Sequence, residues 1–219
     1  MEKQTTTKSG LIVVSKTISA LFTPFTIPFV AFFVLFTFSY LRIMPQQYKL
    51  IVLGIIFCFT ILMPTFTIYL FQKLNKITSA ELGERRRRYY PFLLTIVSYL
   101  FCLVMMLKLR IPWYMVSIIF TGLLVMVIFF LANLKWRLSE HMGGAGMVVG
   151  GLISFSMQFG YNPVWWLCIL ILITGMLGSA RIISGRHSFG EVFFGFLIGF
   201  GCSTIILDPI HSPFLRLFF

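Results

Sequence analysis

The chain has 219 residues, of which 58% are hydrophobic and only 11% are charged, and its formal net charge is +12. A soluble domain carries about 25% charged residues, so this composition excludes an ordinary water-soluble protein and predicts one solvated by lipid. The basic residues, which in a soluble protein would suggest nucleic acid, occupy the short gaps between apolar segments, as basic flanks of membrane helices do. We therefore expect a single integral-membrane domain, residues 1–219, without a nucleic-acid partner.

Apolar segments follow one another along the chain, and a bilayer-spanning helix needs about 20 such residues. The first segment contains Pro24 and Pro28, so we expect it to be kinked, broken or only partly inserted. No apolar–polar alternation of the kind that predicts β-strands competes with a helical interpretation of these segments. The sequence predicts an all-α, polytopic membrane helical bundle with six or seven transmembrane helices, built from these segments: 19–41, 50–71, 91–107, 113–134, 142–159, 164–179 and 192–207.

Two predicted hairpins decide which polar gaps share a membrane face. The third and fourth segments form one hairpin and the fifth and sixth another, so each pair returns the chain to the face where it began. The gaps around these hairpins are therefore expected on one face: 73–90, 135–141 and 180–191. They contain the arginine run 85–88 and two of the chain's three histidines, His141 and His187. Ionisable groups near a membrane core are costly and commonly functional.

Glycines recur at a spacing of four in the fifth and seventh segments, at Gly146 and Gly150 and at Gly195 and Gly199. Glycines on one helix face let two backbones approach closely. The pattern is typical of ordinary membrane-helix packing, and we expect it to hold the polar ends of these two segments together.

His187 and Glu191 are four residues apart, so in a helix they lie on one face. The carboxylate can accept a hydrogen bond from one imidazole nitrogen and fix the tautomer, which leaves the other nitrogen as a nucleophile or base. His141 is suited to protonating a leaving oxygen, and Arg181 offers forked donors that fit phosphate oxygens. Together these groups indicate phosphoryl transfer, in which positioned cations stabilise the transition state.

Each of these residues also has a plainer interpretation. An interfacial histidine can be a headgroup contact, an arginine run can set topology or contact anionic lipids, and Glu191 can be a partner of a helix dipole. A zinc site built from His141, His187 and Glu191 is an alternative, but the sequence contains no short paired-ligand motif for it. We expect neither a metal nor a cofactor.

The segment ARIISGRHSFGE, residues 180–191, resembles the third signature of the type 2 phosphatidic acid phosphatase superfamily. That signature reads Ser-Arg, five residues, His, three residues, Asp. Arg181 and His187 are kept, whereas Ala180 stands for the serine and Glu191 for the aspartate.

The segment LSEH, residues 138–141, resembles the second signature of that superfamily, Pro-Ser-Gly-His, with Ser139 and His141 kept. The surrounding sequence is similar to the variant found in small bacterial members. The segment RRRRYYP, residues 85–91, is a weak match to the first signature, which reads Lys, six residues, Arg-Pro.

The resemblance implies metal-independent hydrolysis of a phosphomonoester or diphosphate on a lipid: phosphatidate, phosphatidylglycerol phosphate, an isoprenoid diphosphate or a lipid A phosphate. It implies that His187 attacks phosphorus and forms a phosphohistidine, that Glu191 orients His187, and that His141 protonates the leaving oxygen and later activates water. The implied phosphate-binding residues are Arg181, Arg88, Arg85, Arg137 and Ser139. The partners are then a lipid phosphate substrate and membrane lipids.

Two hypotheses from other classes remain beside this one. A carrier would bind a lipid phosphate or isoprenoid phosphate without cleaving it, which the substituted second signature and the glutamate at position 191 favour. A structural membrane protein would use the basic groups only to contact anionic lipids.

Signals for the membrane face of the site conflict. More Lys and Arg residues lie on the site's face, which favours a cytoplasmic site, but the excess comes from arginines in or beside the site itself. The resemblance implies a site that faces away from the cytoplasm across the bacterial cell membrane. We adopt that orientation as the expectation, with the first segment kinked at its prolines.

Overall fold

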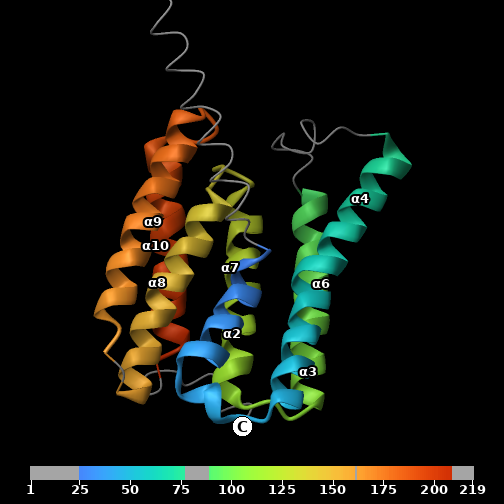
Figure 1. Ribbon diagram of the computed structural model, residues 1–219. Coiled ribbons are helices and arrows are strands. Elements are labelled where there is room, and N and C mark those ends of the chain that lie inside the picture. The colour runs from blue at the N-terminus through green and yellow to red at the C-terminus, as the bar shows by residue number, and fades with distance from the viewer. Residues whose placement is uncertain (1–24, 77–88, 161, 209–219) are drawn as a thin grey trace, which may run out of the picture. The chain divides into compact units, whose positions relative to one another are not determined.

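A computed structural model describes residues 25–76, 89–160 and 162–208, and every regular element in these ranges is a helix (Figure 1). Six helices of the described chain are long and apolar enough to cross a membrane: Gln46–Leu74, Tyr89–Lys108, Trp113–Ala132, Glu140–Phe159, Val164–Ile183 and Phe189–Ile206. The prediction of an all-α membrane protein is confirmed, with six of the predicted segments as spans.

Within the described residues, the first predicted segment forms only a short helix. Helix α2 covers Ile27–Phe38, 12 residues, which rise only about 18 Å against a hydrocarbon core of about 30 Å. Pro28 stands in the first turn, where the missing N–H has no intrahelical partner to lose, so this proline begins the helix and does not kink it. The short 3₁₀ helix η1, Tyr40–Ile43, follows. Pro24 lies outside the described residues.

The second span changes its winding half-way. Helix α3 (Gln46–Ile56) passes through a π turn, η2 (Phe57–Leu62), into α4 (Met63–Asn75). The π turn ends two residues before Pro64, whose ring would clash with the carbonyl four residues back in a regular α-helix. A wider turn relieves such a clash. The apolar segment 50–71 predicts one span, and its sequence pattern does not predict the turn.

The described chain divides into two compact units. The N-terminal unit, residues 25–134, contains α2 to α4, α6 (Tyr89–Lys108) and α7 (Trp113–Ala132). Its core includes Phe32, Ile56, Cys102, Met115 and Ile119, all fully buried. The C-terminal unit begins at residue 135, and the expectation of one domain over the whole chain stays a prediction.

Three helices form the described part of the C-terminal unit: α8 (Glu140–Phe159), α9 (Val164–Ile183) and α10 (Phe189–Ile206). They lie alongside one another (Figure 1). Each extends beyond its predicted apolar segment at the end that carries motif residues, because these polar residues belong to the first or last turn. His141 lies in the first turn of α8, Arg181 in the last turn of α9 and Glu191 in the first turn of α10.

Helices α8 and α10 pack backbone to backbone through the four glycines that the sequence singled out. A Cβ atom added at any of them would lie against a carbonyl oxygen across the contact: Gly146 against Phe196, Gly150 against Phe200, Gly195 against Ser139 and Gly199 against Gly143. The expected close approach is therefore confirmed. It also joins the polar ends of the two helices, because Gly195 faces the residue that caps α8.

Candidate functional site

The loop from α9 to α10 belongs to the segment 180–191, which resembles the third signature. Arg181 stands in the last turn of α9, and the hydroxyl of Ser184 donates to the Arg181 carbonyl at 3.1 Å. Gly185 follows with φ 64°, a left-handed conformation that costs glycine nothing and commonly ends helices. The chain then reaches His187 and Ser188, the residue that caps α10. This sharp turn sets the end of α9 and the start of α10 on either side of His187.

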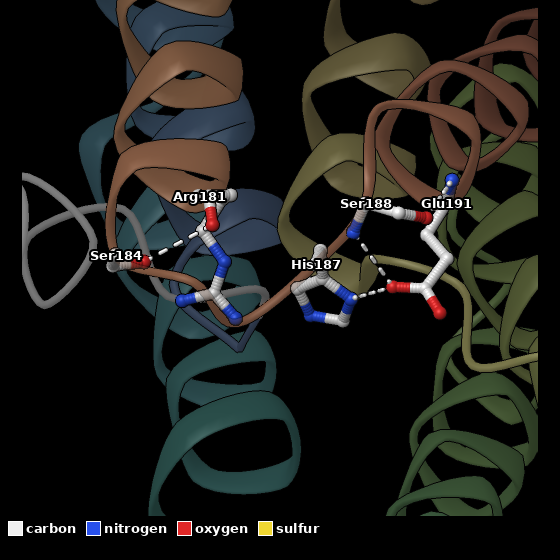
Figure 2. A network of polar contacts seen from close by, with 5 residues as sticks. All are labelled: Arg181, Ser184, His187, Ser188 and Glu191. Atoms are coloured by element: carbon white, nitrogen blue, oxygen red, sulfur yellow. Dashed lines mark hydrogen bonds and ion pairs between the residues drawn. The ribbon is translucent and has the colours of Figure 1, made fainter.

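His187 and Glu191 form the central contact of the site. The Nδ1 atom of His187 lies 3.0 Å from Oε2 of Glu191 (Figure 2), and the side chains are 1% and 18% exposed respectively. A carboxylate only accepts hydrogen bonds, so Nδ1 donates, and in the neutral imidazole the lone pair then lies on Nε2. In Figure 2 this second nitrogen points away from Glu191.

The conformation that creates this contact differs from the predicted one. His187 precedes α10 and is not helical, while Ser188 is extended, with φ −75° and ψ 161°. The Glu191 carboxylate turns back to accept the Ser188 N–H at 3.1 Å, and the Glu191 N–H lies 3.4 Å from the Ser188 hydroxyl. This reciprocal pair is a capping box. Glu191 therefore has two roles at once, as a helix-terminal acid and as a partner of His187.

Arg181 occupies the face of α9 that packs against the other two helices. Four residues earlier on this face, Leu177 is buried in a cluster with Met142 of α8 and Val192 of α10. A Cβ added at Gly178 would lie 3.4 Å from side-chain atoms of both those residues. Arg181 is itself only 7% exposed, and Figure 2 shows its guanidinium extending toward the loop that carries His187. Withdrawal from water strengthens a cation's attraction to an anion.

A main-chain hydrogen bond joins the segment 138–141 to the segment 180–191. Ser139 caps α8, is fully buried, and donates its N–H to the carbonyl of Glu191 at 3.2 Å. Its hydroxyl is also buried and has no hydrogen-bond partner among the described residues. The expectation that the polar ends of the fifth and seventh segments are held together is thus confirmed. The expectation that 73–90 shares their membrane face stays a prediction.

The remaining predicted residues divide into two groups. Arg137 and His141 flank Ser139 on the same segment and are half-buried, so they lie at the end of the unit that carries His187. Arg85 and Arg88 lie outside the described residues, and the role implied for them stays a prediction.

An aromatic cluster that was not predicted lies beside the site. The ring of Trp136 lies 5.0 Å from that of Phe194 and packs over Gly190, while Phe189 and Phe193 stack at 6.0 Å. All four rings are exposed, as interfacial aromatic anchors are. The sequence signal that could have predicted this cluster is the density of aromatic residues directly beside the segments 138–141 and 180–191.

Metal ligation receives no support from the described residues, among which no three His, Cys, Asp or Glu side chains are grouped to hold an ion. His141, His187 and Glu191 accordingly do not form the zinc site considered as an alternative.

Comparisons of the chain with models of protein families, with curated proteins and with solved structures found no match. The likeness to the phosphatase superfamily therefore rests on the motif residues themselves.

Proposed function

We propose that this protein is a membrane-embedded phosphatase that hydrolyses a phosphomonoester or diphosphate on a lipid. The observation that carries the proposal is the buried imidazole of His187, held by a carboxylate 3.0 Å from Nδ1. The carboxylate leaves the lone pair on Nε2 and stabilises the positive charge that appears when this nitrogen attacks. A buried arginine and a second imidazole lie at the same end of the same unit.

The proposed reaction has two steps. In the first, Nε2 of His187 forms a bond to phosphorus as the bond to the lipid oxygen breaks, and His141 gives its proton to that oxygen. In the second, His141 removes a proton from water, the resulting oxygen nucleophile attacks phosphorus, and the phosphorus–nitrogen bond breaks. Inorganic phosphate leaves, and both imidazoles return to their starting protonation states.

Charge stabilisation falls to the groups around this pair. Arg181 would hold phosphoryl oxygens through two forked donors, and the buried Ser139 hydroxyl would donate to another oxygen. Arg137 is the nearest further cation along the Ser139 segment. Arg85 and Arg88 are proposed as phosphate ligands on the resemblance alone.

The position of the site favours an amphiphilic substrate. The polar residues lie at helix ends, and the exposed rings of Trp136, Phe189, Phe193 and Phe194 adjoin them. A lipid phosphate would place its anion among the polar groups while its chains stay in the bilayer beside the rings.

Phosphate release by purified protein tests this proposal. The panel comprises phosphatidate, phosphatidylglycerol phosphate, an isoprenoid diphosphate and a lipid A phosphate, each with wild type and His187→Ala. We expect the wild type to release phosphate from at least one lipid and the variant to release none. Binding of a lipid phosphate by wild type without release would reject the phosphatase and identify the carrier.

The orientation of the site is tested by labelling. Lys135 and Asn162 are exposed residues that flank α8 at opposite ends. In a background without native cysteines, Lys135→Cys should react with a membrane-impermeant thiol reagent on intact cells, and Asn162→Cys should not. The reverse pattern would show that the site faces the cytoplasm.

A further inference from the structure

The contact between α8 and α10 includes residues of the proposed site. Ser139, which caps α8, packs there against Glu191 and Gly195 of α10, and we call this contact the joint. Glu191 and Gly195 lie one turn apart on α10, and the Ser139 peptide packs over both. Its N–H donates to the Glu191 carbonyl at 3.2 Å, and its carbonyl oxygen would lie 2.9 Å from a Cβ placed at Gly195. The absence of a side chain at Gly195 is therefore what lets Ser139 come close enough to bond Glu191.

Ser139 has little freedom to move aside within this joint. Its carbonyl accepts the N–H groups of Met142 and Gly143, which begin α8, at 3.1 and 3.0 Å. Rotation of the peptide away from a new methyl group would break these bonds as well as the one to Glu191. An added side chain at position 195 would consequently displace the whole start of α8, with His141 on it.

The hydroxyl of Ser139 suggests that this joint binds a ligand as well as packing two helices. It is buried and has no hydrogen-bond partner among the described residues, and a buried donor without a partner is costly in a folded protein. The joint thus holds a hydrogen-bond donor where a ligand oxygen would complete it.

We infer that Gly195 is a positioning residue: it sets the start of α8, with Ser139 and His141, in register with the His187–Glu191 pair. This inference rests on the proposed phosphatase function. Gly195 touches no substrate and acts through the Ser139 main chain alone. A misplacement of about 1 Å in such a constellation costs up to about 10²-fold in rate.

Gly150 provides a matched control on the same helix contact. A Cβ there would lie 2.8 Å from the Phe200 carbonyl oxygen and against the Ser203 hydroxyl, so the clash is at least as severe. Its neighbours include no motif residue. Gly201 of α10 has nothing within 4 Å of an added Cβ and serves as the neutral control.

The first test compares Gly195→Ala, Gly150→Ala and Gly201→Ala in detergent by melting temperature and by kcat and KM per folded protein. We expect Gly195→Ala to lose about 10- to 100-fold in kcat with KM much less affected. Gly150→Ala should lose as much melting temperature while its folded fraction keeps the wild-type kcat. Wild-type kcat in Gly195→Ala, or an equal loss of kcat in Gly150→Ala, would overturn the inference.

A second pair of variants approaches the joint from its other side and covers the case in which Gly195→Ala does not fold. Ser139 has φ −85°, about 20° from the centre of the range that proline adopts. Ser139→Pro removes both the N–H and the hydroxyl, whereas Ser139→Ala removes the hydroxyl alone. We expect Ser139→Pro to have the lower kcat by about tenfold or more, and equal values would contradict the joint.

Hydrogen exchange separates this inference from the proposed function. The amides of residues 137–141 should exchange faster in Gly195→Ala than in wild type and at the wild-type rate in Gly150→Ala, because Ser139 loses its acceptor only in the former. Unchanged exchange in Gly195→Ala would overturn the inference, whatever the activity. Absence of turnover in wild type would instead reject the phosphatase, and with it the catalytic purpose of the joint.

Discussion

The two units of the chain treat their polar side chains differently. In the N-terminal unit the buried hydroxyls bond to main-chain carbonyls: Thr60 to Ile56, Thr121 to Ser117 and Ser98 to Phe59. In the C-terminal unit a buried arginine, a buried histidine and a buried serine hydroxyl gather at one end of three helices. Ser203 of the C-terminal unit likewise bonds to a main-chain carbonyl, that of Phe200. The difference between the units is therefore the cluster at the helix ends, whose groups suit an anion.

The π turn shows how a side chain of the N-terminal unit satisfies a main-chain carbonyl. The N–H of Met63 reaches the carbonyl of Cys58, five residues back. In the same register the Phe59 carbonyl would face the nitrogen of Pro64, which carries no hydrogen. The Ser98 hydroxyl of α6 supplies the missing donor at 2.5 Å. Ser98 thus stabilises the local helix structure, whereas the Ser139 hydroxyl has no hydrogen-bond partner among the described residues.

The largest loss of activity is expected from a substitution of Arg181, in the cluster of the C-terminal unit. Arg181→Ala should reduce phosphate release by about 10²-fold or more, because it removes a positioned cation from the phosphoryl group. Arg186→Ala is the matched control, since Arg186 lies in the same loop but is exposed. Equal kcat/KM values for the two variants would show that charge near the membrane, and not a built site, explains both arginines.

Glu191 distinguishes a helix cap from a catalytic partner. Glu191→Gln preserves the capping box, since glutamine also serves there, but removes the charge that stabilises the imidazolium. We expect its kcat to fall by about 10²-fold with an unchanged melting temperature. Glu191→Asp keeps the charge and should retain much more activity despite its shorter reach. A Gln variant as active as wild type would reduce Glu191 to a helix-terminal acid.

Ser98 tests the N-terminal unit. Ser98→Ala leaves the Phe59 carbonyl without its donor, which should lower the free energy of unfolding by about 1 kcal/mol and leave phosphate release unchanged. Ser117→Ala is the control, because its hydroxyl bonds only within its own helix, to Tyr114 at 2.9 Å. Loss of turnover in Ser98→Ala at wild-type stability would break the separation between the two units.

The smallest effect is expected from chelation. Since the proposed steps use only imidazole, carboxylate and guanidinium groups, excess EDTA should leave the rate of phosphate release unchanged. Inhibition that added Zn²⁺ or Mg²⁺ reverses would contradict the metal-independent reaction.

Much of this architecture follows from local sequence patterns. Apolar length predicted the six spans, and the glycine spacing predicted the contact between α8 and α10. The His187–Glu191 contact was also expected from its spacing of four, although it forms through a capping box before the helix. That difference arises because the Ser188 cap takes an extended conformation, and the Glu191 carboxylate reaches back across it.

Features that depend on two distant segments escaped prediction. The bond from Ser139 to Glu191 joins main-chain groups, which carry no side-chain signature in the sequence. The π turn has a local cause in Pro64, but its stabilisation by Ser98 depends on a neighbouring helix. The packing of Trp136 on Phe194 likewise required the three helices to be assembled.

The central claim is that His187 carries the phosphoryl group between the two steps. Wild type mixed with a lipid whose phosphate bears ³²P, and quenched under alkaline conditions that preserve phosphohistidine, should retain label that acid releases. His187→Ala should retain none, and His141→Ala should retain more than wild type if its loss slows the attack of water. Label of equal amount on the His187→Ala variant, or rapid phosphate release by that variant, would contradict the account.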